Sequence, residues 1–293
     1  MSENDIILKV NGLKTYFYQA SGISKAVDGV SFSLRQGTTM GIVGESGSGK
    51  SVTSASVMRL MPSKTGKIVD GSIIFDGVDI RNLSEAQMEK FRGDECCMIF
   101  QNPMTSLDPV FKIGHQMVEM IREHEKISKK DAWAKAVEAL KLVGIPEAEK
   151  RMDAYPHELS GGMCQRVIIA MAVCGHPKLI IADEPTTALD VTVQAQVLEL
   201  LKDLQKKLNT AILLITHNPR RCLGDVRHRH GHVCRKYRRI RGYKDALQRA
   251  ASPVHLGSFR LHAETQQLHK GGLKDDPGHT AGSPPYRPLL QLL

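Results

Sequence analysis

An eight-residue glycine-rich segment constrains the fold of this chain more than any other feature. It matches the pattern GxxxxGK[ST] and directly follows an apolar run at residues 40–43. Glycines let backbone N–H groups turn toward phosphate oxygens at a helix N-terminus, where the helix dipole favours anions. The pattern therefore predicts a strand, a phosphate-binding loop and a helix, rather than a flexible turn. The predicted phosphate-binding residues are Gly44, Glu45, Ser46, Gly47, Ser48, Gly49, Lys50 and Ser51.

Within this loop, two side chains have distinct expected tasks. Lys50 supplies a positive charge for the β- and γ-phosphates, and the Ser51 hydroxyl is a ligand for Mg²⁺. A second segment supplies the acid groups: the apolar residues 179–182 are followed by Asp183 and Glu184. Four apolar residues in a row predict a strand buried on both faces of a parallel sheet, and ligands bind such sheets at the carboxyl ends of the strands. We expect Asp183 to hold Mg²⁺ and Glu184 to polarise an attacking water; the alternative is a pair of helix-capping carboxylates.

The remaining pattern predicts an α/β fold. Short apolar runs rich in Ile, Val or Leu predict strands at residues 39–43, 73–75, 97–100, 179–182 and 211–215. A Ser-x-x-Gln capping box predicts a helix over 84–92, and Ser128 begins another that Gly144 and Pro146 end. Residues from about 103 to 157 show no strand pattern. We therefore expect a helical insertion in an α/β core.

The net charge of +9 does not describe the whole chain. Residues 1–217 carry 25 Lys and Arg against 26 Asp and Glu, a net charge of −1, whereas residues 218–293 carry 15 against 5, a net charge of +10. Such a change divides the chain into two compositional regions. A basic charge balance can indicate nucleic-acid binding, but here it is confined to the C-terminal region.

Targeting and redox signals point to a cytosolic chain. The longest apolar run, residues 167–174, is far shorter than the roughly 20 residues of a spanning helix. The N-terminus is acidic and lacks the charged and apolar regions of a signal peptide. The six cysteines form no CxxC pair, so we expect reduced thiols rather than a disulfide framework.

A second glycine-containing motif precedes an apolar helix pattern. Ser160 is a good N-cap, and Gly161 and Gly162 permit a ligand to approach the first turn of the helix. Alone, this motif is a weak signal. Its position 23 residues before Asp183 makes it informative.

With these segments in order, the chain resembles the ATP-binding subunits of ABC transporters. The glycine loop resembles Walker A, residues 159–165 the family signature, and residues 179–184 Walker B with its catalytic glutamate. Gln101 resembles the Q-loop glutamine, His217 the switch histidine, and residues 187–190, ending in Asp190, the D-loop. Residues 26–32 and 101–109 resemble the oligopeptide and dipeptide importer branch, to which nickel importers also belong. The implied fold is a P-loop NTPase (RecA-like) ABC nucleotide-binding domain with a helical subdomain insertion.

The resemblance implies an ATP hydrolase that works as a head-to-tail dimer. Each ATP would lie between one subunit's phosphate loop and the partner's Ser160, Gly161 and Gly162, with Asp190 also at the site. Gln101 would sense Mg²⁺ and the γ-phosphate, so the implied metal ligands are Ser51, Gln101 and Asp183. The implied catalytic residues are Glu184, His217 and Gln101.

The implied partners place the chain at a membrane. They are integral-membrane permease subunits, gripped by the helical insertion, and a second, homologous or identical, ATP-binding subunit. An extracytoplasmic substrate-binding protein would act indirectly, and no nucleic acid is expected. The implied location is peripheral, on the cytoplasmic face of the cell membrane.

Three other functions fit parts of the sequence. The first is the ATPase subunit of a nickel importer. The second is a soluble ABC ATPase associated with nucleic acid, whose basic tail would bind phosphates. The third is a non-enzymatic zinc module, because cysteine and histidine are common zinc ligands. Its ligands would be Cys222, His228, His230, His232 and Cys234.

Residues 218–293 are expected to be an out-of-frame reading of the original gene, and to be disordered. The composition changes abruptly at residue 218, immediately after the resemblance ends. Codons can be chosen for residues 218–242 that, read one nucleotide out of step, spell NLGVVWEMCDTVMVMYAGNIVEYG, which resembles the family's missing helix, strand and turn. We therefore expect an ATP-binding domain at 1–217, with its helical part at about 103–157, followed by an atypical tail.

Overall fold

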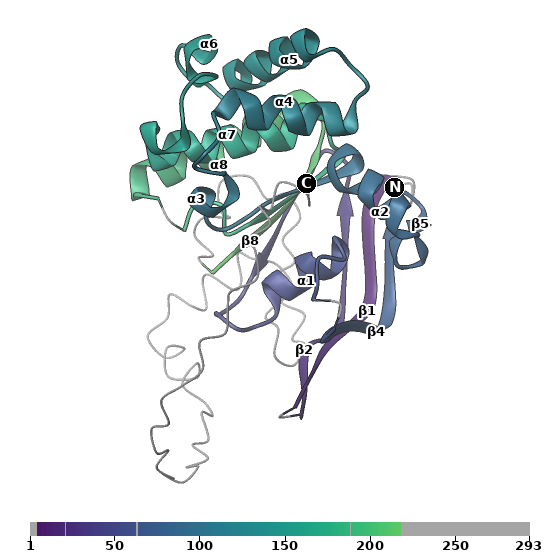
Figure 1. Ribbon diagram of the computed structural model, residues 1–293. Helices are drawn as coiled ribbons and strands as arrows, with labels where there is room; N and C mark the ends of the chain where they lie inside the picture. The colour runs from purple at the N-terminus through teal and green to yellow at the C-terminus, as the bar shows by residue number, and fades with distance from the viewer. Residues whose placement is uncertain (1–4, 21, 63, 188, 218–293) are drawn as a thin grey trace, which may run out of the picture.

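The computed structural model describes residues 5–20, 22–62, 64–187 and 189–217 (Figure 1). The predictions for residues 218–293, including the frame change and the zinc ligands, lie outside the described residues. Within them, no helix is both long enough and apolar enough to cross a membrane.

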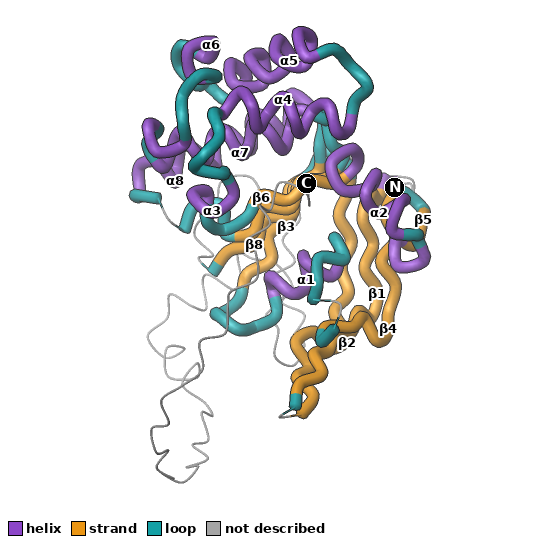
Figure 2. The backbone as a smooth tube through the Cα atoms, in the orientation of Figure 1, coloured by secondary structure: helices purple, strands orange, loops and turns teal. Residues whose placement is uncertain are grey.

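A parallel sheet of four strands forms the centre of the structure (Figure 2). Its order is β3 (Thr39–Val43), β8 (Ala211–Thr216), β7 (Leu179–Asp183) and β6 (Cys96–Ile99). Every residue of β7 is buried; Ile180 contributes to the core on one face of the sheet and Ile181 to the core on the other. This confirms the predicted strand buried on both faces, and β6 begins one residue earlier than predicted.

A second, antiparallel sheet covers one face of the parallel sheet, and the sequence did not predict most of it. Its order is β2 (Gly22–Arg35), β1 (Ile6–Gln19), β4 (Gly66–Phe75) and β5 (Val78–Asp79). Shifts of register interrupt the pairing of β1 with both of its neighbours. Because each shift breaks the alternation of buried and exposed side chains, the strand pattern is obscured in the sequence. For the same reason, only the last three residues of β4 were predicted.

Helices gather on the other side of the parallel sheet, at the top of Figure 1. Between β6 and β7 the described residues contain only helices, turns and loops. The helices of this region are α3 (Pro103–Ser106), α4 (Ile113–His124), α5 (Lys129–Leu142), α6 (Ala148–Arg151), the 3₁₀ helix Pro156–Glu158 and α7 (Gly161–Cys174). Of these, α4, α5, α6 and α7 share one hydrophobic cluster with α8 (Val191–Leu208), which the sequence did not predict.

Local capping explains where the predicted helices begin. Ser84 and Gln87 form the predicted capping box of α2 (Glu85–Lys90), and Ser128 caps α5 by accepting from the Asp131 backbone N–H. Side-chain oxygens at these positions satisfy N–H groups that the first helical turn leaves without partners. A wide turn at Phe91–Glu95 follows α2. Two further short helices are α1 (Lys50–Val57) and the 3₁₀ helix Ile80–Asn82.

Candidate active site

Four neighbouring parallel strands end at one edge of the sheet, and each is followed by a predicted site residue. The glycine loop follows β3, His217 follows β8, Glu184 follows β7 and Gln101 lies just beyond β6. Because all four strands are parallel, their carboxyl ends meet at the same edge. Segments that are far apart in the sequence are therefore brought into one site.

The glycine loop closes around the side chain of Lys50. Gly49 has φ +88°, and a Cβ there would lie 2.2 Å from the carbonyl oxygen of Ala26, so this position requires glycine. The ammonium of Lys50 is buried and donates to the carbonyls of Gly44 and Glu45, at 2.8 Å each. The Ser48 hydroxyl is buried and has no hydrogen-bond partner among the described residues. A buried positive charge beside an unpartnered hydroxyl fits a phosphate group.

Ser51 and Asp183 present oxygen ligands suited to Mg²⁺. The Ser51 hydroxyl donates to Oδ1 of Asp183 at 3.1 Å. Burial raises the pKa of the Asp183 carboxyl, and the nearby charge of Glu184 raises it further, against the opposing hydrogen bond from Ser51. Since the folded chain binds this proton more tightly than the unfolded chain, stability is lost as the pH rises through the raised pKa. A divalent cation would offset the cost of the buried carboxylate, because oxygen ligands of this kind bind Mg²⁺.

Three side chains converge on one carboxylate oxygen of Glu184. Oε2 of Glu184 accepts from Nε2 of Gln101 at 3.1 Å and from Oγ1 of Thr187 at 3.0 Å. Nδ1 of His217 lies 3.4 Å from the same oxygen. The structure thus brings together Glu184, Gln101 and His217, as the sequence predicted. Their arrangement suits a carboxylate that takes a proton from a water molecule, with an amide and an imidazole beside it.

The Ser160 motif lies against a different element. The Ser160 hydroxyl caps α7 by accepting from the Met163 backbone N–H at 3.3 Å. A Cβ on Gly162 would lie 2.7 Å from Val193, in the first turn of α8. The same turn is capped by Asp190, whose Oδ1 accepts from the backbone N–H groups of Thr192 and Val193. The contacts of Ser160 and Gly162 within the described residues are therefore with α7 and α8, not with the glycine loop.

The sequence did not single out Thr187, although it is bonded to Glu184. The sequence did contain a signal for this bond. A hydroxyl residue commonly bonds back across a turn when it lies three positions after a carboxylate in a segment rich in turn-forming residues. The segment was noted only as part of the D-loop motif.

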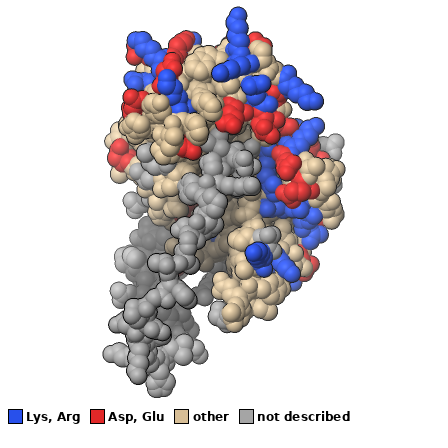
Figure 3. Space-filling model, in the orientation of Figure 1, with Lys and Arg blue, Asp and Glu red and all other residues tan. Residues whose placement is uncertain are grey.

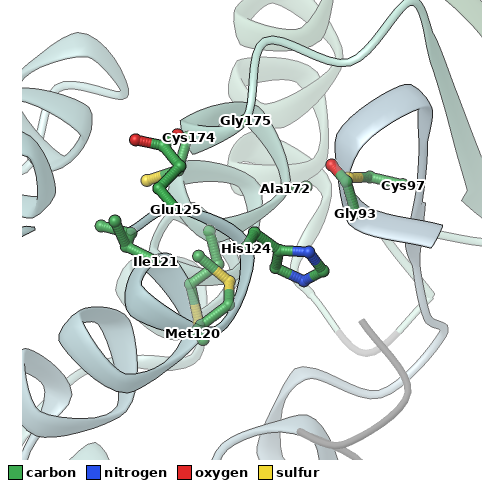
Figure 4. A pocket seen from close by; sticks show the side chains of 10 residues that line it. Gly93, Cys97, Met120, Ile121, His124, Glu125, Ala172, Cys174 and Gly175 are labelled. Carbon is green, nitrogen blue, oxygen red and sulfur yellow. The ribbon is translucent and has the colours of Figure 1, made fainter. Parts of the chain in front are cut away.

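A small cavity between the parallel sheet and the helices is lined by two thiols (Figure 4). His124 reaches from α4 toward Gly93, and its Nδ1 lies 3.3 Å from Asp94. Cys97 and Cys174 also line this cavity, and burial raises the pKa of each thiol to about 12. Because the thiolate is the reactive form, both are inert at neutral pH. Among the described residues, no group of three or more His, Cys, Asp or Glu side chains could hold a metal ion.

The surface of the described part carries both charges. On the face shown in Figure 3, positive and negative side chains are interspersed over the helices rather than gathered by sign. This agrees with the net charge of −1 counted for residues 1–217.

Comparison with known proteins extends the match from motifs to most of the chain. The family model described as "ABC transporter" matches residues 27–187. The oligopeptide transport ATP-binding protein OppD of Bacillus subtilis (strain 168) is 57% identical over 212 residues, which are 72% of this chain and 59% of that protein. The peptidoglycan transport ATP-binding protein YejF of Agrobacterium fabrum (strain C58 / ATCC 33970) is 44% identical over 279 residues, which are 95% of this chain and 49% of that protein.

The fold is also found in a solved structure. The dimeric structure of the ATP-binding cassette MJ0796 in a post-hydrolysis state, bound to ADP and Pi, superimposes with a TM-score of 0.64 at 26% identity. The match covers 73% of this chain and 89% of that one. The chain spans less than two thirds of the length of the curated relatives named above. Because the family model covers more than half of its residues, the chain belongs to the ABC transporter family.

Proposed function

We propose that this chain is the ATP-binding and ATP-hydrolysing subunit of an importer of oligopeptides or dipeptides. The observation that carries the proposal is the convergence of Gln101, Thr187 and His217 on Oε2 of Glu184, at the sheet edge where the glycine loop also lies. An acid group with three neighbours, placed beside the glycine loop, suits hydrolysis of a phosphoanhydride by water.

Different residues of this chain have different roles in the hydrolysis of ATP. Lys50 and the loop N–H groups bind and orient the β- and γ-phosphates. Ser51 and Asp183, with Gln101, would hold Mg²⁺, which would supply positive charge at the phosphate oxygens. Glu184 accepts a proton from the attacking water, and His217 contacts the γ-phosphate. The products are ADP and inorganic phosphate.

A complete site requires two subunits. Ser160, Gly161 and Gly162 lie at the start of α7, where the helix dipole favours an anion. The side chains nearest to Gly161 and Gly162 are Leu189, just before α8, and Val193, in its first turn. In a head-to-tail dimer, Ser160, Gly161 and Gly162 bind the ATP held by the partner's loop. This arrangement is supported by the dimeric form of the related cassette MJ0796.

Membrane partners follow from the proposed transport role. The chain docks on integral-membrane permease subunits through its helical region and is peripheral, on the cytoplasmic face of the membrane. An extracytoplasmic binding protein delivers the peptide to the permease. The 57% identity to an oligopeptide transport ATP-binding protein supports a peptide as the transported substrate over nickel.

Lys50→Ala tests the nucleotide-binding part of the proposal. Removing the buried ammonium removes a charge-assisted contact to phosphate, so the dissociation constant for ATP should rise about 10- to 100-fold. Binding of a fluorescent ATP analogue to the full chain measures this. Lys9→Ala, which removes an exposed lysine, is the matched control and should bind like the parent. Equal affinities for all three chains would contradict the proposed phosphate contact.

A further inference from the structure

The turn after β7 contains a hydroxyl group to which the proposed function assigns no task. Oγ1 of Thr187 donates to Oε2 of Glu184 at 3.0 Å. The backbone N–H of Thr187 also donates to the carbonyl oxygen of Glu184, at 3.2 Å. Both the side chain and the main chain of Thr187 thus bond to the residue three positions earlier. The turn fixes the hydroxyl beside the carboxylate.

The backbone of Glu184 also holds its side chain in a defined position. Glu184 has φ +49°, a left-handed conformation that a residue other than glycine adopts only at a conformational cost. Its backbone N–H donates to the carbonyl oxygen of Ile215 in β8, at 2.9 Å, which ties the start of the turn to the sheet. The main chain therefore sets the direction of the Glu184 side chain, and the hydrogen bond from Thr187 restrains the carboxylate group.

The three neighbours of Oε2 differ in how they are attached. Gln101 follows β6 and His217 follows β8, so each of their contacts with Oε2 joins two different strand ends. Under the proposed function, both turn toward Mg²⁺ and the γ-phosphate once nucleotide is bound. Thr187 belongs to the same turn as Glu184, and its bond spans only three residues. It remains on Oε2 when the other two neighbours leave.

We propose that Thr187 is a positioning residue for Glu184, an inference that rests on the proposed ATP hydrolysis. Its hydroxyl holds Oε2, so that Oε1 is directed at the attacking water. The Glu184 side chain is 15% exposed, and a hydrogen bond to a charged carboxylate is stronger than one between two neutral groups. The proton of the water passes to Oε1, while the Thr187 hydroxyl keeps its own proton.

Substitutions at Thr187 separate positioning from a structural role. In the full chain, Thr187→Val removes the hydroxyl but keeps the shape, and its kcat for ATP hydrolysis should fall about tenfold. The KM for ATP should stay within about twofold, because the lost bond acts on the attacking water and not on bound ATP. Thr187→Ser, which keeps the hydroxyl, should restore kcat. Thr187 is exposed, so substitution should not unfold the chain, and Thr187→Ala should repeat the loss without the β-branched side chain.

The outcomes distinguish this inference from the proposed function. Thr192→Val, at an exposed threonine in the first turn of α8, is the control and should match the parent. If the parent hydrolyses ATP, Glu184→Gln does not, and Thr187→Val equals the parent, the positioning role is overturned and the proposed function stands. Equal losses in Thr187→Val and Thr187→Ser also overturn it. A parent chain without ATPase activity overturns both.

Discussion

Glu184→Gln should abolish nearly all ATP turnover while leaving ATP binding intact. The substitution keeps the shape of the side chain and its acceptor oxygen, so neighbours such as Gln101 and Thr187 can remain in place. It removes the negative charge that takes a proton from water, and loss of a general base costs typically 10²- to 10⁴-fold in rate. Release of inorganic phosphate by the full chain, together with the affinity for ATP, measures both parts of this prediction.

A second glutamate provides the control for this experiment. Glu199, an exposed residue of α8, can be changed to Gln without touching the site, and Glu199→Gln should turn over ATP at the parent rate. Turnover by Glu184→Gln equal to that of the parent would remove Glu184 from the catalytic role. Loss of ATP binding in Glu184→Gln would show that the carboxylate supports the shape of the site instead.

Ser160→Arg should separate ATP binding from hydrolysis in a different way. Ser160 is exposed, and its hydroxyl bonds to the Met163 N–H rather than to the glycine loop of its own chain. An isolated subunit should therefore bind ATP as the parent does. In the head-to-tail dimer, the arginine would occupy the space that the partner's γ-phosphate needs, so hydrolysis should fall at least about 100-fold, a loss typical for removal of a preorganised contact to the reacting group.

Helix capping must be controlled in this experiment, because loss of an N-cap alone costs about 1 kcal/mol. Ser128 caps α5 in the same way and is also exposed, so Ser128→Arg is a matched variant. It should lose similar stability in thermal unfolding yet hydrolyse ATP at the parent rate. If Ser128→Arg loses as much activity as Ser160→Arg, or if Ser160→Arg remains active, the motif does not act across a dimer.

The parallel sheet could be predicted from the sequence because each of its strands is buried on both faces. Such strands read as continuous apolar runs, and β3 was predicted with its observed bounds. Asp183 and Glu184 could be placed at the carboxyl end of a buried strand from the sequence pattern. Gln101 and His217 were identified by resemblance to a family, and in the structure each lies just beyond a neighbouring strand.

The antiparallel sheet could not be predicted in the same way. β1 is interrupted by register shifts, and residues of both polarities alternate irregularly along it. Its pairing depends on β2 and β4, which are distant contacts that no local pattern encodes. The bond from Thr187 to Glu184 was missed for a different reason, because the segment 187–190 was considered only for its resemblance to the D-loop.

Peptide uptake into sealed vesicles tests the central claim most directly. The full chain would be reconstituted in proteoliposomes with the permease subunits, the second ATP-binding subunit and the substrate-binding protein of a peptide importer. Uptake of a labelled oligopeptide should require ATP and Mg²⁺, and it should stop when the chain carries Glu184→Gln. ATP-dependent uptake of nickel without uptake of peptide, or peptide uptake that continues with Glu184→Gln, would contradict the account.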